Sequence, residues 1–488
     1  MRKRFEQQLS IGQIPIEDTF INPKSKHAID ELLAALKEIY ATKEYNERIF
    51  SILERHLVFT KENTGRNGMD LWQIFVLAQV RLTLNMSYET LLNLSNNHKG
   101  IRGLMGVERD FGYEDIQFEY QNIYDNVSLL NDKIVKELNQ VILDFGHNEI
   151  LKKKENTALH LKTDSFVVES NVHFPTDYNL LWDSARKCLD TISKIIERHS
   201  YIPGWRKLKN WRYELKGLMR ELGKASNSGG KNKQVRMLQA ANKYLTKAKV
   251  LSDKLKNQLP KLPQEDIDDI ALVLMLNDYI SLMDKHIDLI ERRVIKGETI
   301  AHHEKIFSIF EQYTEWIKKG KLRPNVELGK KLMITSDESD LIVDYQLLNQ
   351  QQDRDVVIEL ADRLLPRFKV ASWSFDKGYW SKENKALLQL EVPHVIMPKL
   401  GKRNKSEESE ESARSYKLLK NKHSGIESNI NELEHRGLDR CPDRGENNYK
   451  TYVGLAICAY NLKKIGRQIL QEERAFLKKE KDRLRQAA

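Results

Sequence analysis

The first third of the chain has the hydrophobic periodicity of a small helical bundle. Apolar residues recur at helical spacing around Leu32 and Leu36, and residues 69–84 are apolar on most faces. This spacing predicts amphipathic helices, and an all-round apolar helix is expected to be buried among others. Another long helix is predicted over 126–145. Short helices and tight turns near 87–100 are also typical of a helix-turn-helix unit, although any small bundle has this pattern.

A β pattern begins after residue 155. Residues 161–164 are predicted to form a strand that ends in the carboxylate Asp164, followed by a second short strand over 166–168. Apolar runs at 332–335 and 341–345 flank a polar turn, which predicts a hairpin.

The next segment alternates between strand and helix. A strand over 370–375 ends at Asp376, and a helix over 382–390 and a strand over 392–397 follow. Strand, helix and strand in this order imply parallel pairing in an α/β sheet. A charged loop is predicted over 401–415, and a long helix beginning near Tyr416 carries Glu427.

These patterns predict an all-α N-terminal region over 1–150, interpreted as DNA-binding, and an α/β catalytic domain over 155–470. Roughly 200 residues separate Asp164 from Asp376, more than a bare α/β sheet needs. The helical stretch 180–325 is therefore interpreted as an insertion. A charged helical tail is predicted over 471–488.

The positive charge is concentrated in one part of this insertion. The chain carries a net charge of +10, but residues 205–256 alone hold fifteen Lys and Arg against three acids. Cations spaced along helices neutralise phosphates, which predicts salt-sensitive DNA binding rather than an uninvolved solvated face. The candidate DNA-binding residues are Arg206, Lys207, Lys209, Arg212, Lys216, Lys231, Lys233 and Arg236.

The remaining composition excludes several classes of protein. The three cysteines, Cys188, Cys441 and Cys458, are far apart and form no CxxC pair, which argues against a zinc knuckle or a disulfide framework. No stretch approaches the length of an apolar membrane span, and the basic N-terminus lacks the apolar run of a signal peptide. We therefore expect an intracellular protein.

Three carboxylates are placed where a metal site could form. Asp164 and Asp376 are predicted at strand ends of an α/β sheet, and Glu427 lies on a helix after the sheet. Converging carboxylates suit two Mg²⁺ ions that activate a nucleophile and stabilise the leaving oxygen of a phosphodiester. Taken singly, each Asp has the ordinary interpretation of a cap or turn residue, and Glu427 that of a solvated helix residue.

Three blocks of sequence resemble bacterial insertion-sequence transposases of the DDE type. Thr163-Asp164-Ser165, together with 167–177, resembles their first carboxylate block. Asp376-Lys377-Gly378-Tyr379 resembles their second block, and Gly425-Ile426-Glu427 with the segments up to Leu462 resembles their C-terminal catalytic block. Residues 72–106 are also similar to the helical domain that precedes the core in such enzymes.

The resemblance implies an RNase H-like catalytic core and cut-and-join chemistry on transposon ends and target DNA. It implies Asp164, Asp376 and Glu427 as the catalytic, metal-binding triad, with two Mg²⁺ ions for which Mn²⁺ can substitute. By analogy it also implies a homodimer on DNA and a cytoplasmic, nucleoid-associated protein. Glu432 is the alternative to Glu427, and Asp344 is the alternative to Asp376.

The chain departs from the family around Glu427. Many relatives place Tyr and Arg before the catalytic Glu and Lys after it, whereas the corresponding positions here are Lys420, His423 and Glu434. His423, one helical turn from Glu427, is a candidate phosphate contact, and Arg436 is a candidate replacement for the later base. Two other functions stay open: an inactive DNA-binding protein derived from a transposase, and a metal-dependent nuclease without strand transfer.

Overall fold

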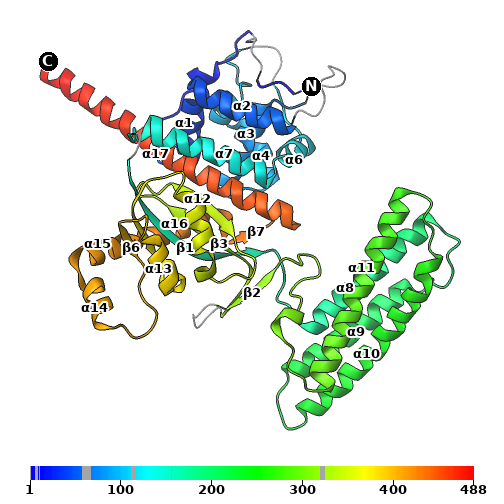
Figure 1. The fold of residues 1–488 in the computed structure, drawn as a ribbon. Coiled ribbons are helices and arrows are strands. Elements are labelled where there is room, and N and C mark those ends of the chain that lie inside the picture. Colours follow the sequence, from blue (N-terminus) through cyan, green and yellow to red (C-terminus); the bar gives the residue numbers. More distant parts are fainter. Residues whose placement is uncertain are drawn as a thin grey trace. The chain divides into compact units, whose positions relative to one another are not determined.

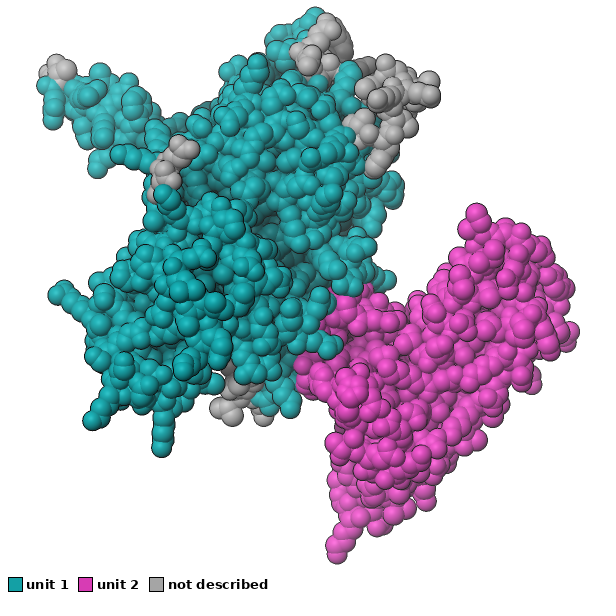
Figure 2. All heavy atoms as spheres, in the orientation of Figure 1, with its two compact units in different colours: residues 1–171, 317–488 teal, residues 172–316 magenta. Residues whose placement is uncertain are grey.

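The computed structural model divides the chain into two compact units. Unit 1 comprises residues 1–171 and 317–488, and unit 2 comprises residues 172–316 (Figure 2). The structure describes residues 2–5, 9, 11–57, 68–111, 116–154, 157–318 and 325–487. Each unit is considered by itself.

Unit 1 contains a mixed sheet centred on one long strand, β1 (Leu159–Ser170) (Figure 1). On one side β1 pairs antiparallel with β3 (Val326–Ser336), which in turn pairs antiparallel with β4 (Ile342–Leu347). On the other side β1 pairs parallel with β5 (Val370–Phe375), which pairs parallel with β6 (His394–Ile396). The predicted hairpin and the predicted parallel strand–helix–strand unit are both confirmed.

Two short strands complete the β structure of the described residues. The chain returns to unit 1 through β2 (Glu315–Lys318), and β7 (Arg440–Cys441) pairs parallel with the end of β1. The helices that connect or follow the strands are α12 (Val357–Leu364), α13 (Lys382–Leu388), α14 (Lys405–Ser412), α15 (Arg414–His423) and α16 (Gly425–Leu433).

Three local predictions in this unit were wrong. Asp164 does not end a strand, because β1 runs unbroken through it. The charged loop expected over 401–415 contains α14, since Asn404 and Glu407 form a capping box at its start. The single helix expected from Tyr416 is divided at Ser424 into α15 and α16.

The N-terminal helices pack around the end of the chain. The long helix α17 (Glu446–Ala487) contacts α1 (Ala28–Ala41), α3 (Leu71–Thr83) and α7 (Asp132–Phe145). Gly466 permits this close approach, because a Cβ there would lie 1.6 Å from the Glu31 carbonyl oxygen. The apolar first half of α17 and the N-terminal helices therefore share one core. The remaining helices here are α2 (Lys43–Leu57), α4 (Tyr88–Asn97), α5 (Lys99–Leu104) and α6 (Tyr120–Val127).

One N-terminal expectation needs correction. The helix expected over 126–145 is two helices, because α6 ends at Val127 and Asn131 caps the start of α7. The stretch 87–100, where a helix-turn-helix unit was predicted, contains α4 and the start of α5, and its DNA-binding role stays a prediction.

Unit 2 contains a bundle of four long helices. They are α8 (Asp177–Arg198), α9 (Leu208–Asn227), α10 (Lys233–Gln258) and α11 (Ile267–Ile290) (Figure 1). Buried residues from all four helices, such as Leu189, Leu222, Leu251 and Ile280, form one core. Residues 296–318 contain no long helix, although a helical stretch was expected over 180–325. All three cysteines are buried, and none of them forms a disulfide among the described residues.

Candidate active site

The first two candidate carboxylates follow a matched pair of residues on adjacent strands. Thr163 of β1 is the register partner of Phe375 of β5, and the two strands are parallel. Asp164 is the next residue of β1, and Asp376 directly follows the end of β5. The pairing therefore brings them together although 211 residues lie between them in sequence. Trp373 Nε1 also donates a 2.8 Å hydrogen bond to Thr163 Oγ1 across the same strands.

Electrostatics place Asp164 in a negatively charged environment. The pKa of its carboxyl is raised from 3.8 to about 7, first by burial and then by the charges of neighbouring carboxylates. A 2.7 Å hydrogen bond from the Ser165 backbone N–H opposes this rise. The neighbours that raise it are Asp376, Asp353 and Glu427. All three predicted carboxylates are therefore close enough to interact.

Glu427 reaches this site from the first turn of α16. The break at Ser424 lets the chain turn between α15 and α16, and α16 contacts β1. Lys162 of β1 lies beside this helix start, since a Cβ on Gly425 would be 3.1 Å from Lys162 Nζ. Lys162 Nζ also donates a 2.9 Å hydrogen bond to Asp340 Oδ1.

His423, at the end of α15, lies close enough to Asp376 and Glu427 to feel their charges. A 3.0 Å hydrogen bond joins its Nδ1 to Ser374 Oγ on β5. Burial lowers the pKa of His423, and Lys162 lowers it as well, whereas Asp376 and Glu427 act in the opposite direction. The imidazole is therefore held neutral and in a fixed position beside the acidic site.

Asp353 is a fourth carboxylate that the sequence did not reveal. Its Oδ1 accepts a 2.9 Å hydrogen bond from Ser165 Oγ, and its Oδ2 lies 3.1 Å from Lys331 Nζ. Gly378 leaves room for it, because a Cβ there would be 3.3 Å from Asp353 Oδ2. Asp353 belongs to a polar turn after the hairpin, so neither periodicity nor a motif marks it.

Part of the chain matches a known protein family. Residues 292–462 match the family model of the transposase DDE domain. This part of the chain is therefore similar to a transposase DDE domain. The matched region includes Asp376 and Glu427 and begins after Asp164. No curated protein and no solved structure gives a significant match to the chain.

The carboxylates of the candidate site suit a divalent cation. DDE domains generally use such ions, and hard carboxylate oxygens are the ligands that Mg²⁺ and Mn²⁺ prefer. The oxygens of Asp164, Asp376 and Glu427 do not all lie within 4.8 Å of one another. That spacing is compatible with two ions about 3.5–4 Å apart, because ligands of different ions need not touch.

A tighter acidic group lies in unit 2 and has a structural explanation. His199, Glu265 and Asp269 place their ligand atoms within 4.8 Å of one another. Asp269, however, is already bound at 2.8 Å by both Arg198 Nε and His199 Nε2. These bonds join the end of α8 to the start of α11, so we interpret the group as an ion-pair network.

The alternative carboxylates form ion pairs with other residues. Asp344 on β4 is half-buried and lies 2.9 Å from Arg363. Glu432 pairs with Lys463 and lies 3.2 Å from Lys464. Arg436, a candidate phosphate contact, instead donates a 2.6 Å hydrogen bond to the Thr83 carbonyl oxygen. These contacts favour structural roles for all three residues.

The candidate DNA-binding residues of unit 2 fall into two groups. Arg212 forms a 2.8 Å ion pair with Asp190, and Arg236 donates a 2.7 Å hydrogen bond to the Gly229 carbonyl oxygen. The other six are exposed and make no ion pair among the described residues: Arg206, Lys207, Lys209, Lys216, Lys231 and Lys233. No described helix is long and apolar enough to span a bilayer.

Proposed function

We propose that this chain is an insertion-sequence transposase that cleaves and joins DNA with divalent metal ions held by Asp164, Asp376 and Glu427. The observation that carries the proposal is the register of β1 and β5, which places Asp164 beside Asp376 with Glu427 close enough to raise the pKa of Asp164. We further infer an RNase H-like core, supported by antiparallel strands on one side of β1 and parallel strands on the other.

The proposed chemistry is transfer of a phosphodiester between oxygens. Two bound ions, Mg²⁺ or Mn²⁺, would activate the attacking water or 3′-hydroxyl and stabilise the leaving oxygen. Asp164 must lose its proton before it can act as a ligand, and its raised pKa sets the pH at which this happens.

The residues around the triad have supporting roles in this proposal. Ser374 fixes Nδ1 of His423, which leaves Nε2 for a hydrogen bond to a DNA phosphate. Because His423 is neutral, that contact is a directional hydrogen bond rather than an ion pair. Ser165 and Lys331 hold Asp353 in place, so this fourth carboxylate tunes the charge around Asp164.

A cleavage-and-joining assay tests the proposal. The substrate is DNA that carries the sequences flanking the gene, together with a target plasmid, in Mg²⁺ or Mn²⁺. We expect wild type to give joined products, and Asp164→Asn, Asp376→Asn and Glu427→Gln to give none. Asp344→Asn is the matched control, because it removes a carboxylate of the same domain that lies outside the proposed triad.

The same assay separates the competing functions. Cleavage without joined products would favour a metal-dependent nuclease. Tight DNA binding without cleavage by wild type would favour an inactive protein derived from a transposase. We also propose that two copies act on paired ends, which light scattering of the protein–DNA complex would measure as two chains per pair of ends.

A further inference from the structure

We propose that one face of helix α9, formed by Lys209, Tyr213, Lys216, Arg220 and Lys224, is a docking surface for the backbone of duplex DNA. This inference rests on the proposed function, because it names the part of unit 2 that holds the substrate. It narrows the predicted basic segment to a single helix face. We call these five residues the α9 face.

The α9 face follows from helical geometry. Its members are separated by four, three, four and four residues, which places them along one side of an α-helix. All five are exposed or half-buried, and Tyr213 is 83% exposed. The opposite side of α9 carries Leu215, Leu222 and Ala225, which are buried in the core of the bundle. The α9 face therefore points away from that core.

The acids of α9 are turned away from this face. Glu221 lies 3.0 Å from Lys243, and Glu214 pairs with Lys247, both partners being on α10. Arg212, on the other flank of α9, pairs with Asp190 of α8. The flanks of α9 therefore use charge to hold neighbouring helices, and the α9 face is left with cations alone.

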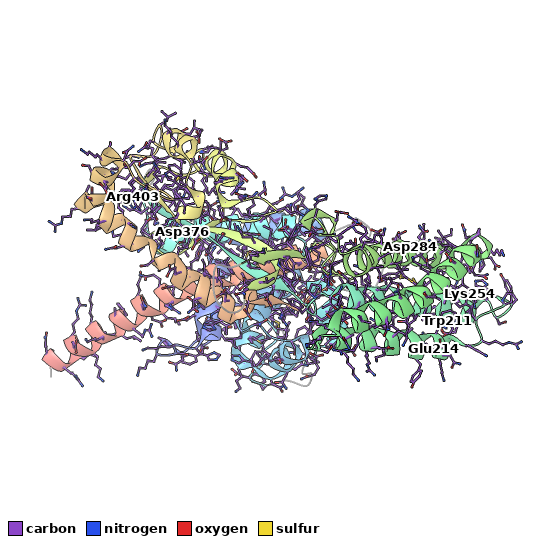
Figure 3. The ribbon with its side chains drawn as sticks, turned by 90° about the horizontal axis from the view of Figure 1, so that it is seen from below. Trp211, Glu214, Lys254, Asp284, Asp376 and Arg403 are labelled. Atoms are coloured by element: carbon purple, nitrogen blue, oxygen red, sulfur yellow. The ribbon has the colours of Figure 1, made fainter. Side chains whose placement is uncertain are left out.

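Apart from Lys233 at its first residue, the lysines of α10 have partners of their own. Lys249 lies 2.5 Å from Glu291, and Lys256 lies 2.7 Å from Asp284. Lys254 lies 4.3 Å from the centre of the Trp205 ring, and Figure 3 shows Lys254, Trp211 and Glu214 together in this bundle. Within these two helices, the lysines that can neutralise phosphates without first losing a protein partner are therefore those of the α9 face, together with Lys233.

The ends of α9 extend the basic surface. Exposed Arg206 and Lys207 precede the helix, and exposed Lys231 and Lys233 follow it. Fifteen residues separate Lys209 from Lys224, which corresponds to about 22 Å of helix, or about six base pairs of B-DNA. A face of Lys, Arg and Tyr without Asn or Gln suits phosphates and sugars rather than base edges, so binding should tolerate any sequence.

Binding of a 30-base-pair duplex, measured by fluorescence anisotropy in EDTA from 50 to 200 mM salt, tests the proposal on the full chain. The face variant is K209Q/K216Q/R220Q/K224Q. The matched control is K243Q/K247Q/K249Q/K256Q, which removes the same charge from paired positions of α10. Loss of four phosphate contacts should reduce the slope of log K against log salt by about 3.6.

The face variant and wild type should differ strongly in the salt dependence of their DNA affinity. Across this salt range the affinity of wild type should fall about 10²-fold more than that of the face variant. The control should keep a slope close to that of wild type. Equal losses of slope in both variants, or no loss in either, would overturn the proposal. Circular dichroism of each variant reports whether the bundle is folded. If the quadruple variant does not fold, the single variants K216Q and R220Q provide the test, and each should reduce the slope by about 0.9.

Tyr213 gives an independent test. Tyr213→Ala removes an uncharged contact, so affinity should fall about 3- to 10-fold while the salt slope stays unchanged. An unchanged affinity would remove Tyr213 from the surface. Because these measurements use no metal, they are separate from catalysis. An inactive wild type with the expected contrast in slopes would contradict the proposed function alone, whereas an active face variant with unchanged slope would contradict the docking surface alone.

Discussion

Asp164 directly follows Thr163 and Asp376 directly follows Phe375, and these two preceding residues are register partners on neighbouring parallel strands. Two carboxylates held this close repel each other when no cation is present. Burial and this repulsion raise the pKa of Asp164 to about 7, so the acidic site resists losing its proton. Figure 3 labels Asp376 within this part of unit 1.

Asp164→Asn should stabilise the metal-free protein at alkaline pH. Between about pH 4 and pH 7 the folded protein holds a proton on Asp164 that the unfolded chain releases. The stability from this proton is full below about pH 4 and is lost as the pH rises through about 7. In EDTA we expect the variant to gain about 2–4 kcal/mol at pH 8 and clearly less at pH 5, as measured by denaturant unfolding.

The control for this measurement is Asp362→Asn. Asp362 is exposed on α12 and makes no ion pair among the described residues. Its substitution should leave the difference between pH 5 and pH 8 unchanged. A gain of equal size for both variants would contradict the role assigned to Asp164.

Mg²⁺ should stabilise wild type in a pH-dependent manner. An ion that binds only the folded state raises the melting temperature, and it must displace the proton of Asp164 to bind. The shift in melting temperature caused by Mg²⁺ should therefore be large at pH 8 and small at pH 6. Differential scanning calorimetry of wild type and Glu427→Gln measures this, and an unchanged shift in the variant would argue against Glu427 as a ligand.

Asp353→Asn should lower the pH at which Mg²⁺ begins to stabilise the protein. Removing one of the charges that raise the pKa of Asp164 lets Asp164 ionise at lower pH. The pH midpoint of Mg²⁺ stabilisation should fall by a few tenths of a unit or more, while Asp362→Asn leaves it in place. An upward movement would instead identify Asp353 as a ligand in its own right.

His423→Ala should slow cleavage while leaving metal binding intact. A lost hydrogen bond to a phosphate costs about 10- to 100-fold in rate when it acts in the transition state. The Mg²⁺-induced shift in melting temperature should match that of wild type. Ser374→Ala, which only releases Nδ1 of His423, should have a smaller effect on rate. Loss of Mg²⁺ binding in His423→Ala would contradict this division of roles.

The ion pair of Asp344 and Arg363 should matter for stability rather than catalysis. Arg363→Ala leaves the half-buried carboxylate of Asp344 without its partner, which costs about 3 kcal/mol. The cost should be larger at pH 8 than at pH 5, because burial raises the pKa of Asp344. Asp344→Asn should keep metal-dependent cleavage. If Asp344→Asn instead abolished cleavage as Asp376→Asn is expected to, the assignment of the triad would need to change.

The sequence by itself determined most of the elements. The hydrophobic periodicity of the sequence predicted α3, the β3–β4 hairpin, β5 and α13, because the apolar residues of each element recur at the spacing typical of its buried face. The uneven distribution of Lys and Arg along the chain also marked the basic segment, since local composition needs no tertiary contacts. The three carboxylates were selected by local motifs, and their role as a triad stays a proposal.

Only the tertiary structure decided how distant residues meet. The register of β1 and β5, the division of α15 from α16 at Ser424, and the position of Asp353 depend on contacts between segments far apart in sequence. The tertiary structure also decided which charges of unit 2 are paired, because local composition does not distinguish a paired lysine from an unpaired one. Pairing across helices neutralises lysines of α10 and leaves those of the α9 face without an acidic partner, because only the folded bundle fixes which acid each cation can reach.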